Sequence, residues 1–208
     1  MATRDIIVIG ASAGGSDVLK TLARNLPPNI DAAIFVVWHL SPDAPGVLPD
    51  ALNREGRVPA KNATDGEKFK PCRIYVAPPE HHLTLERGCF RMAKGPKENR
   101  FRPAVDPLFR SAAYVYRERV IGVILSGALD DGTSGLWSVK RFGGMAVVQD
   151  PLDAEFPSMP QNALQAVKAD HVAASSELAG LLVRLTREEA KSSEVPMKDE
   201  LTEIEIRI

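Results

Sequence analysis

A serine between a predicted strand and a predicted helix is the feature that most constrains the fold of this chain. The run from Asp5 to Ile9 is short, apolar and β-branched, as buried parallel strands are. Apolar residues then recur at helical spacing from Val18 to Leu26. The sharp turn between them places Ser12 at the carboxyl edge of a sheet, beside helix N–H groups that stabilise negative charge.

Three interpretations of this turn compete. A phosphate-binding loop needs G-x-G-x-x-G or G-K-[ST], and the glycines at positions 10, 14 and 15 fit neither pattern. A nucleophile turn has the pattern G-x-S-x-G, which residues 10–14 satisfy. A serine at this place can also simply cap the helix. The turn alone leaves the last two interpretations open.

Composition bounds the class of protein. A chain of 208 residues with 44% hydrophobic and 25% charged residues is one globular domain, or one domain with an appendage. A net charge of -1 argues against nucleic acid or an anionic membrane as the main partner. No apolar run reaches the ~20 residues of a membrane span, and the first residues lack a signal peptide's features. We therefore expect a cytoplasmic protein with no direct membrane insertion.

Repeated strand and helix patterns predict an α/β fold with a doubly wound, mostly parallel sheet, helices on both faces and one antiparallel β-hairpin. Further parallel strands are expected at residues 31–38, 73–77, 120–125, 145–148 and 171–174, and the hairpin at 82–92. The run 120–125 is the most apolar and is expected at the centre. Residues 61–70 are predicted as turns, and the basic loop 94–102 as solvated. Asp106 is expected to cap a helix that opens at Pro107.

Residues 1–187 are predicted to form the α/β domain, and residues 188–208 a linker and a short tail strand. The last eight residues, LTEIEIRI, alternate between apolar and polar side chains. We hypothesise that this tail takes part in docking or dimerisation.

Polar residues also follow two other predicted parallel strands. His39 comes directly after the strand 31–38, and Asp130 and Asp131 come shortly after the strand 120–125. Parallel strands end at one edge of a sheet, which is also where Ser12 is expected. A serine, a histidine that takes its proton and a carboxylate that orients the histidine form a nucleophilic site. Whether they meet depends on the order of the strands.

A metal site is not predicted. Glu80, His81 and His82 are consecutive, but adjacent strand residues face opposite ways, and no further ligand has suitable spacing. We expect neither a metal nor an organic cofactor.

Several motifs in one order carry a resemblance to a known family. They are IGASAGG at 9–15, WHLSPD at 38–43, VAPPEHHLTL at 76–85, RFRPAVDPLFRSAA at 100–113, LSGALDDGTSG at 125–135 and QDP with FPSMP at 149–160. Together they resemble the catalytic domain of the chemotaxis protein-glutamate methylesterases, the CheB family. The resemblance runs from about Asp5 to Arg187.

The resemblance implies a serine esterase that removes methyl groups from γ-glutamyl esters on the cytoplasmic helices of methylated chemoreceptors, with glutamine deamidation as a second reaction. It assigns Ser12 as the nucleophile, His39 as the general base and Asp131, directly before Gly132, as the carboxylate. The backbone N–H groups of Ala13 and Ala128 would form the oxyanion hole.

The chain also departs from the family pattern. Trp38 stands for a usual glutamine, Leu129 for a usual glycine, and Ala13 and Ala128 for threonine and methionine. An N-terminal receiver domain is expected to be absent, so activity would either be constitutive or be controlled by a separate regulatory protein that replaces it. The alternatives left open are a serine hydrolase of the same fold that acts on another ester or amide, and a non-catalytic regulatory or binding module.

Overall fold

The computed structural model describes residues 2–39 and 47–190. The predicted tail Leu201–Ile208 therefore lies outside the described residues. Within them, no helix combines the length and the apolar character that crossing a membrane requires.

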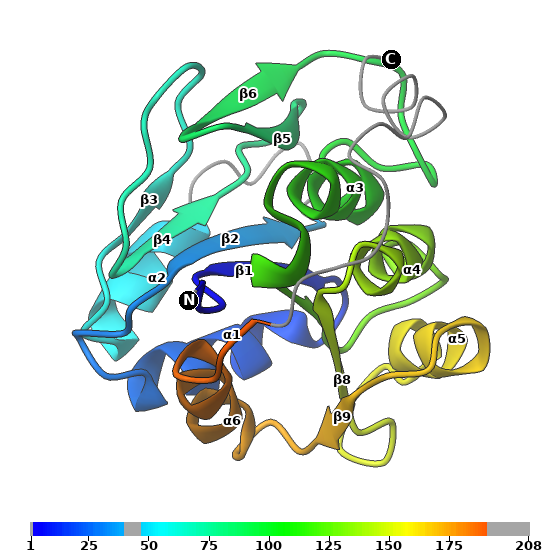
Figure 1. Cartoon of the computed structure of the whole chain (residues 1–208). Coiled ribbons are helices and arrows are strands. Elements are labelled where there is room, and N and C mark those ends of the chain that lie inside the picture. Colours follow the sequence, from blue (N-terminus) through cyan, green and yellow to red (C-terminus); the bar gives the residue numbers. More distant parts are fainter. Residues whose placement is uncertain (1, 40–46, 191–208) are drawn as a thin grey trace.

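A parallel seven-stranded sheet forms the centre of the molecule (Figure 1). Its strands, in spatial order, are β3 (Ala60–Asn62), β4 (Arg73–Val76), β2 (Ala33–Trp38), β1 (Ile6–Ala11), β7 (Val120–Ile124), β8 (Met145–Gln149) and β9 (His171–Ala173). The chain passes from β1 to β2, then to the edge strand β3 and back to β4, which lies between β3 and β2. It later returns to β7 beside β1 and winds outward the other way through β8 to β9. The predicted doubly wound α/β fold is confirmed. β1 takes the middle place that we expected for 120–125, and β7 lies beside it.

Helices cover both faces of the sheet. One apolar core contains residues of α1 (Gly15–Asn25), α2 (Val47–Glu55) and α6 (Leu178–Thr186). The opposite core contains residues of α3 (Val105–Tyr116), α4 (Thr133–Arg141) and α5 (Ser158–Ala166). A short 3-10 helix, η1 (Arg117–Arg119), leads from α3 into β7. Because β1 packs between both cores, Ile6 to Ile9 are all buried, as the apolar run predicts.

The predicted hairpin is present as β5 (His82–Glu86) and β6 (Cys89–Ala93), and it packs beside α3 (Figure 1). Strand β3 was not predicted, because residues 61–70 read as turns. It has only three residues and pairs with β4 at the edge of the sheet, where a polar sequence such as Ala-Lys-Asn is tolerated. A strand this short gives no periodic signal.

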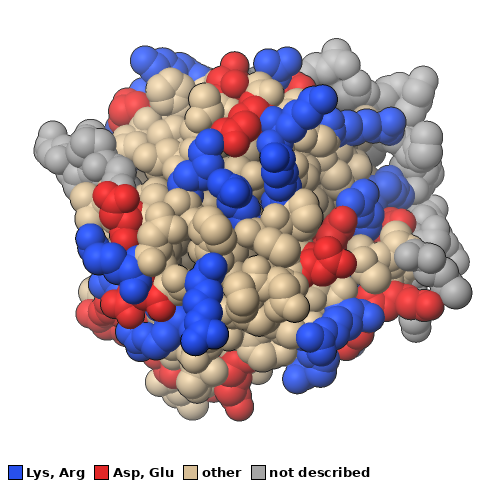
Figure 2. Space-filling view, turned by 90° about the vertical axis from the view of Figure 1, so that its left-hand side faces the viewer, with Lys and Arg blue, Asp and Glu red and all other residues tan. Residues whose placement is uncertain are grey.

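Figure 2 shows the side of the molecule at which β1 and β2 begin. Lysine and arginine side chains gather near the middle of this face, with aspartate and glutamate among and around them (Figure 2). Asp5 and Arg119, which precede β1 and β7, form a 2.6 Å ion pair there. The site described next lies at the other end of these strands.

Candidate active site

The sheet order brings the three predicted residues together. Ser12 follows β1, His39 follows β2, and Asp131 lies between β7 and α4, so all three leave adjacent strands. The N–H of His39 donates to the carbonyl of Ala11 (3.1 Å), which extends the β1–β2 pairing to the histidine. This is the point where the winding direction reverses, and loops on the two sides of such a point diverge and leave room for a ligand.

The three side chains form a hydrogen-bonded chain. His39 Nδ1 lies 3.1 Å from Ser12 Oγ, and His39 Nε2 lies 2.6 Å from Asp131 Oδ2. With the proton on Nε2 donated to the carboxylate, Nδ1 accepts the hydrogen bond of the serine hydroxyl. The side chains of His39 and Asp131 are only 3% and 0% exposed. The arrangement can therefore remove a proton from Ser12 in a site shielded from water.

Phe101 fixes the plane of the His39 ring. The two rings stack with centroids 3.7 Å apart and planes 9° from parallel. Phe101 belongs to the loop 94–102, and the prediction that this loop is merely solvated is wrong for its second half. Charged residues dominate the loop sequence, and only the tertiary structure turns an aromatic ring toward the histidine.

Asp131 lies at the amino end of α3, where unpaired helix N–H groups favour negative charge. Its carboxylate accepts hydrogen bonds from the N–H of Val105 (2.7 Å) and of Asp106 (3.2 Å), and from Asn99 Nδ2 (2.8 Å). Burial acts to raise the pKa of Asp131, but the hydrogen bond and charge of His39, with these donors, outweigh it and lower the pKa. Asp130 is exposed, so the two neighbouring aspartates have opposite surroundings.

Asp106 does not cap its own helix, as we had expected. Ala104, with extended backbone, precedes α3, and Asp106 lies in its first turn. Its carboxyl instead accepts the N–H of Gly135 at the start of α4 (2.6 Å) and Asn99 Nδ2 (2.7 Å). Burial, followed by the nearby charge of Asp131, raises its pKa to about 6.

The free energy of unfolding should decrease as pH rises, because Asp106 has a raised pKa in the folded protein. The ordinary pKa of an aspartate side chain is 3.8, whereas the pKa of Asp106 in the folded protein is about 6. Between pH 3.8 and about pH 6, Asp106 of the folded protein holds a proton that the unfolded chain has released. The stabilisation from Asp106 is therefore fully present below pH 3.8 and is lost as the pH rises through about 6. Relative to Asp106→Asn, the wild type should lose ~2 kcal/mol of unfolding free energy between pH 4 and 7. Urea denaturation of both proteins measures it, because the titration of Asp131 largely cancels in the difference. A pH-independent difference would contradict the prediction.

The two proposed oxyanion donors lie in turns that meet at Ser12. Ser12 N–H donates to the carbonyl of Ser126 (3.0 Å), and Ser126 Oγ donates to the carbonyl of Ala13 (2.9 Å). A Cβ built on Gly127 would lie 2.8 Å from Ser12 Cβ and would collide with the sulfur of Met159. Ala128 therefore follows a residue that only glycine can occupy without displacing the nucleophile turn. Within the described residues, the N–H groups of Ala13 and Ala128 donate to no acceptor.

Leu129 occupies a backbone conformation that favours glycine. Its φ is 67°, its side chain is exposed, and its N–H donates to Ser158 Oγ. Leu129→Gly should therefore raise the unfolding free energy by ~0.5–1 kcal/mol, because the left-handed strain disappears while little apolar contact is lost. Thermal denaturation checks this, with Leu129→Ala as the control that keeps the strain. The explanation fails if the alanine variant is at least as stable as the glycine variant.

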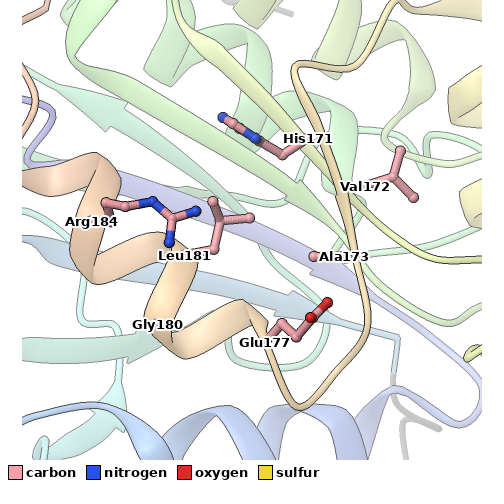
Figure 3. A pocket seen from close by; sticks show the side chains of 7 residues that line it. All are labelled: His171, Val172, Ala173, Glu177, Gly180, Leu181 and Arg184. Atoms are coloured by element: carbon pink, nitrogen blue, oxygen red, sulfur yellow. The ribbon is translucent and has the colours of Figure 1, made fainter.

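A cavity of about 360 Å³ lies elsewhere, between β9 and α6. Figure 3 shows Arg184 and Leu181 extending from α6 toward the side of β9 that carries His171. Three charged or titratable side chains line it (His171, Glu177 and Arg184), but Ser12, His39 and Asp131 do not. The cavity is thus separate from the hydrogen-bonded chain.

The histidine of the hairpin serves the fold. His82 is buried, its Nε2 donates to the carbonyl of Pro96 (2.8 Å), and its Nδ1 accepts the N–H of Ala104 (3.2 Å). Glu80 pairs with Arg102 at 2.7 Å. Among the described residues no cluster of His, Cys, Asp and Glu could hold a metal ion.

Comparison with known proteins identifies the family. The family profile described as CheB methylesterase matches residues 7–182. The chain belongs to the CheB methylesterase family. A crystal structure of the Thermotoga maritima CheB methylesterase catalytic domain matches with a TM-score of 0.84 and 35% identity, and covers 88% of this chain and 100% of that domain.

Curated relatives of the CheB family differ in length. A relative from Leptospira interrogans is 40% identical over 182 residues, which are 87% of this chain and 94% of the relative. A protein-glutamate methylesterase/protein-glutamine glutaminase from Anaeromyxobacter dehalogenans is 36% identical, and the match covers 88% of this chain but only 54% of that protein. The CheB catalytic domain thus occurs both in proteins of about this length and in longer ones.

Sequence reasoning did not find Asn99, Phe101 or the link from Asp106 to Asp131. The motif RFRPAVDPLFRSAA contains Phe101 and Asp106 and marked the region, but not their contacts. Sequence reasoning also gave no role to Gln149. Its Oε1 accepts the N–H of Ser126 (2.8 Å) and so supports the turn that approaches Ser12.

Proposed function

We propose that this chain hydrolyses γ-glutamyl methyl esters on the cytoplasmic helices of methylated chemoreceptors. The observation that carries the proposal is the chain of hydrogen bonds from Ser12 Oγ to His39 (3.1 Å) and from His39 to Asp131 (2.6 Å), in a member of the CheB methylesterase family. Relatives named as protein-glutamate methylesterases support the choice of ester.

In the proposed reaction, His39 Nδ1 takes the hydroxyl proton of Ser12 as Oγ attacks the ester carbonyl. The carbonyl oxygen becomes an oxyanion, which accepts hydrogen bonds from the N–H groups of Ala13 and Ala128. Asp131 stabilises the positive charge on His39 during this step. Protonated His39 then donates its proton to the departing methoxide, which leaves as methanol. The glutamyl group remains bound to Ser12 Oγ as an ester.

Water completes the cycle. His39 removes a proton from a water molecule that attacks the Ser12 ester, and returns the proton to Ser12 Oγ as the glutamate carboxylate leaves. The same steps convert a glutamine amide to glutamate with release of ammonia. The paired name of the relatives favours this as a second activity.

Methanol release tests the proposal directly. Receptor signalling fragments carrying tritiated methyl esters are incubated with the purified chain, and volatile tritium is counted. A matched fragment with glutamine at the same positions is assayed for ammonia. The methylesterase proposal predicts tritiated methanol with the first fragment. Hydrolysis of small esters without receptor demethylation would instead favour a hydrolase of the same fold with another substrate.

A further inference from the structure

Asn99 joins two carboxyl groups with one amide nitrogen. Its Nδ2 donates to Asp131 Oδ1 at 2.8 Å and to Asp106 Oδ2 at 2.7 Å. A primary amide nitrogen has two hydrogens, and here each is used by a different carboxyl. Asn99 has a φ of 49°, a left-handed conformation that asparagine tolerates better than most residues.

The same two carboxyls connect two helices. Asp131 precedes α4 but accepts N–H groups from the first turn of α3, whereas Asp106 lies in α3 but accepts the N–H of Gly135 in α4. Each carboxyl thus satisfies donors at the start of the other helix. Asn99 lies between them and ties this crossed arrangement to the loop 94–102.

Residues 98–101 of this loop contact both His39 and Asp131. Glu98 and Phe101 pair through their backbones (2.8 and 3.2 Å), and Glu98 forms a 2.8 Å ion pair with Arg110 of α3. Held in this way, the segment places Asn99 on Asp131 and the Phe101 ring on His39.

We propose that Asn99 and Asp106 are positioning residues that hold the Asp131 carboxylate in the plane required by His39. The proposal rests on the proposed function of Ser12, His39 and Asp131. The terminal torsion of an aspartate is broad, so the carboxylate needs partners on both oxygens to keep one orientation. Oδ2 is held by Val105 and His39, and Oδ1 is held by Asn99 and more loosely by the N–H of Asp106.

The amide also separates two groups that would otherwise repel each other. Asp106 and Asp131 are both buried, and like charges at close range oppose each other's ionisation. A donor shared between them stabilises the charge on both. Other charged or titratable groups also act on these two carboxyls. His39 stabilises the charge of Asp131, and Arg110, which is paired with Glu98, stabilises the charge of Asp106. Asn99 is therefore the uncharged link in a network of ionisable groups.

Labelling of Ser12 by a fluorophosphonate tests the proposal without a receptor substrate. Asn99→Ala should slow labelling and lower kcat for methanol release by ~10–100-fold, the range found when the hydrogen-bond partner that orients a metal-ligating residue is lost. The KM should change little, because the side-chain nitrogen of Asn99 is hydrogen-bonded to Asp131 and Asp106 and its proposed effect is exerted through Asp131. Asn99→Asp keeps the size but replaces the donor with a titrating acceptor. Its labelling rate relative to wild type should fall from pH 5 to pH 8, as the new carboxyl ionises beside Asp131.

Asn53→Ala is the matched control. Asn53 also makes two hydrogen bonds, both to Ala60 of the edge strand β3, which lies away from the candidate active site. Loss of the Asn53 side chain should therefore weaken the fold and leave labelling unchanged. The proposal is overturned if Asn99→Ala labels at the wild-type rate, if Asn53→Ala loses as much, or if Asn99→Asp shows no pH-dependent loss. Labelling of wild type without methanol release would refute the substrate and not the positioning role. Absence of wild-type labelling would overturn both.

Discussion

Ser12→Ala is expected to lower turnover by ~10⁶-fold, since removing the nucleophile of such a site costs about as much as removing all three members. Within residues 2–39 and 47–190, the hydroxyl that lies against His39 Nδ1 is that of Ser12, and the His39 ring is held in this orientation by Phe101 and Asp131. Tritiated methanol released from methylated receptor fragments measures the loss. Binding of the fragment should persist, because the proposed oxyanion donors, the N–H groups of Ala13 and Ala128, are backbone groups that the substitution keeps.

Ser138→Ala is the control for Ser12→Ala. Ser138 is similarly buried, but its Oγ donates to the carbonyl of Ser134 within α4. This variant should keep wild-type turnover within about twofold, as changes away from the reacting groups usually do. Residual activity of more than a few per cent in Ser12→Ala, in a preparation free of wild type, would show that Ser12 is not the nucleophile.

Asp131→Asn is expected to lower kcat by ~10⁴-fold, the effect seen when the carboxylate that orients a catalytic histidine becomes an amide. Four N–H donors converge on the two oxygens of Asp131: those of His39, Val105, Asp106 and Asn99. An asparagine has only one acceptor oxygen, so its NH₂ must face a donor. The His39 proton is then no longer fixed on Nε2, and Nδ1 ceases to be a reliable base for Ser12.

Asp130→Asn is the matched control for Asp131→Asn. It makes the same chemical change one residue away, at an exposed side chain. Methanol release and fluorophosphonate labelling should stay near wild type in Asp130→Asn and fall together in Asp131→Asn. The reverse result would mean that the wrong aspartate has been assigned.

Much of the fold could be predicted because its strands are buried on both faces. Continuous apolar runs mark β1, β2, β7 and β8, and glycine-rich turns mark where two of them pass into helices. The order of the strands could not be predicted. Pairing between β1 and β7 joins residues more than 100 positions apart, as Ile6 with Val120, and no local pattern specifies such a partner.

The candidate site divides in the same way. Ser12 lies in the turn after one predicted strand and His39 directly follows another, so local patterns alone placed them at one edge. The choice of Asp131 over Asp130 depended on its place before Gly132 in the family motif, and burial now separates the two residues. Asn99 and Phe101 lie in a loop without periodicity, and their contacts with Asp131 and His39 bridge 32 and 62 positions.

The sequence by itself determined the longer strands, their glycine-rich turns and the places of Ser12 and His39 after strand ends, because hydrophobic period and glycine placement act over a few residues. Only the tertiary structure decided that β1 lies between β2 and β7, which brings Ser12, His39 and Asp131 within hydrogen-bond reach. It also decided that Asp106 caps α4 instead of α3. Hydrogen bonds and ring stacking act over 3 to 4 Å, and which atoms come that close is set by how all the elements pack.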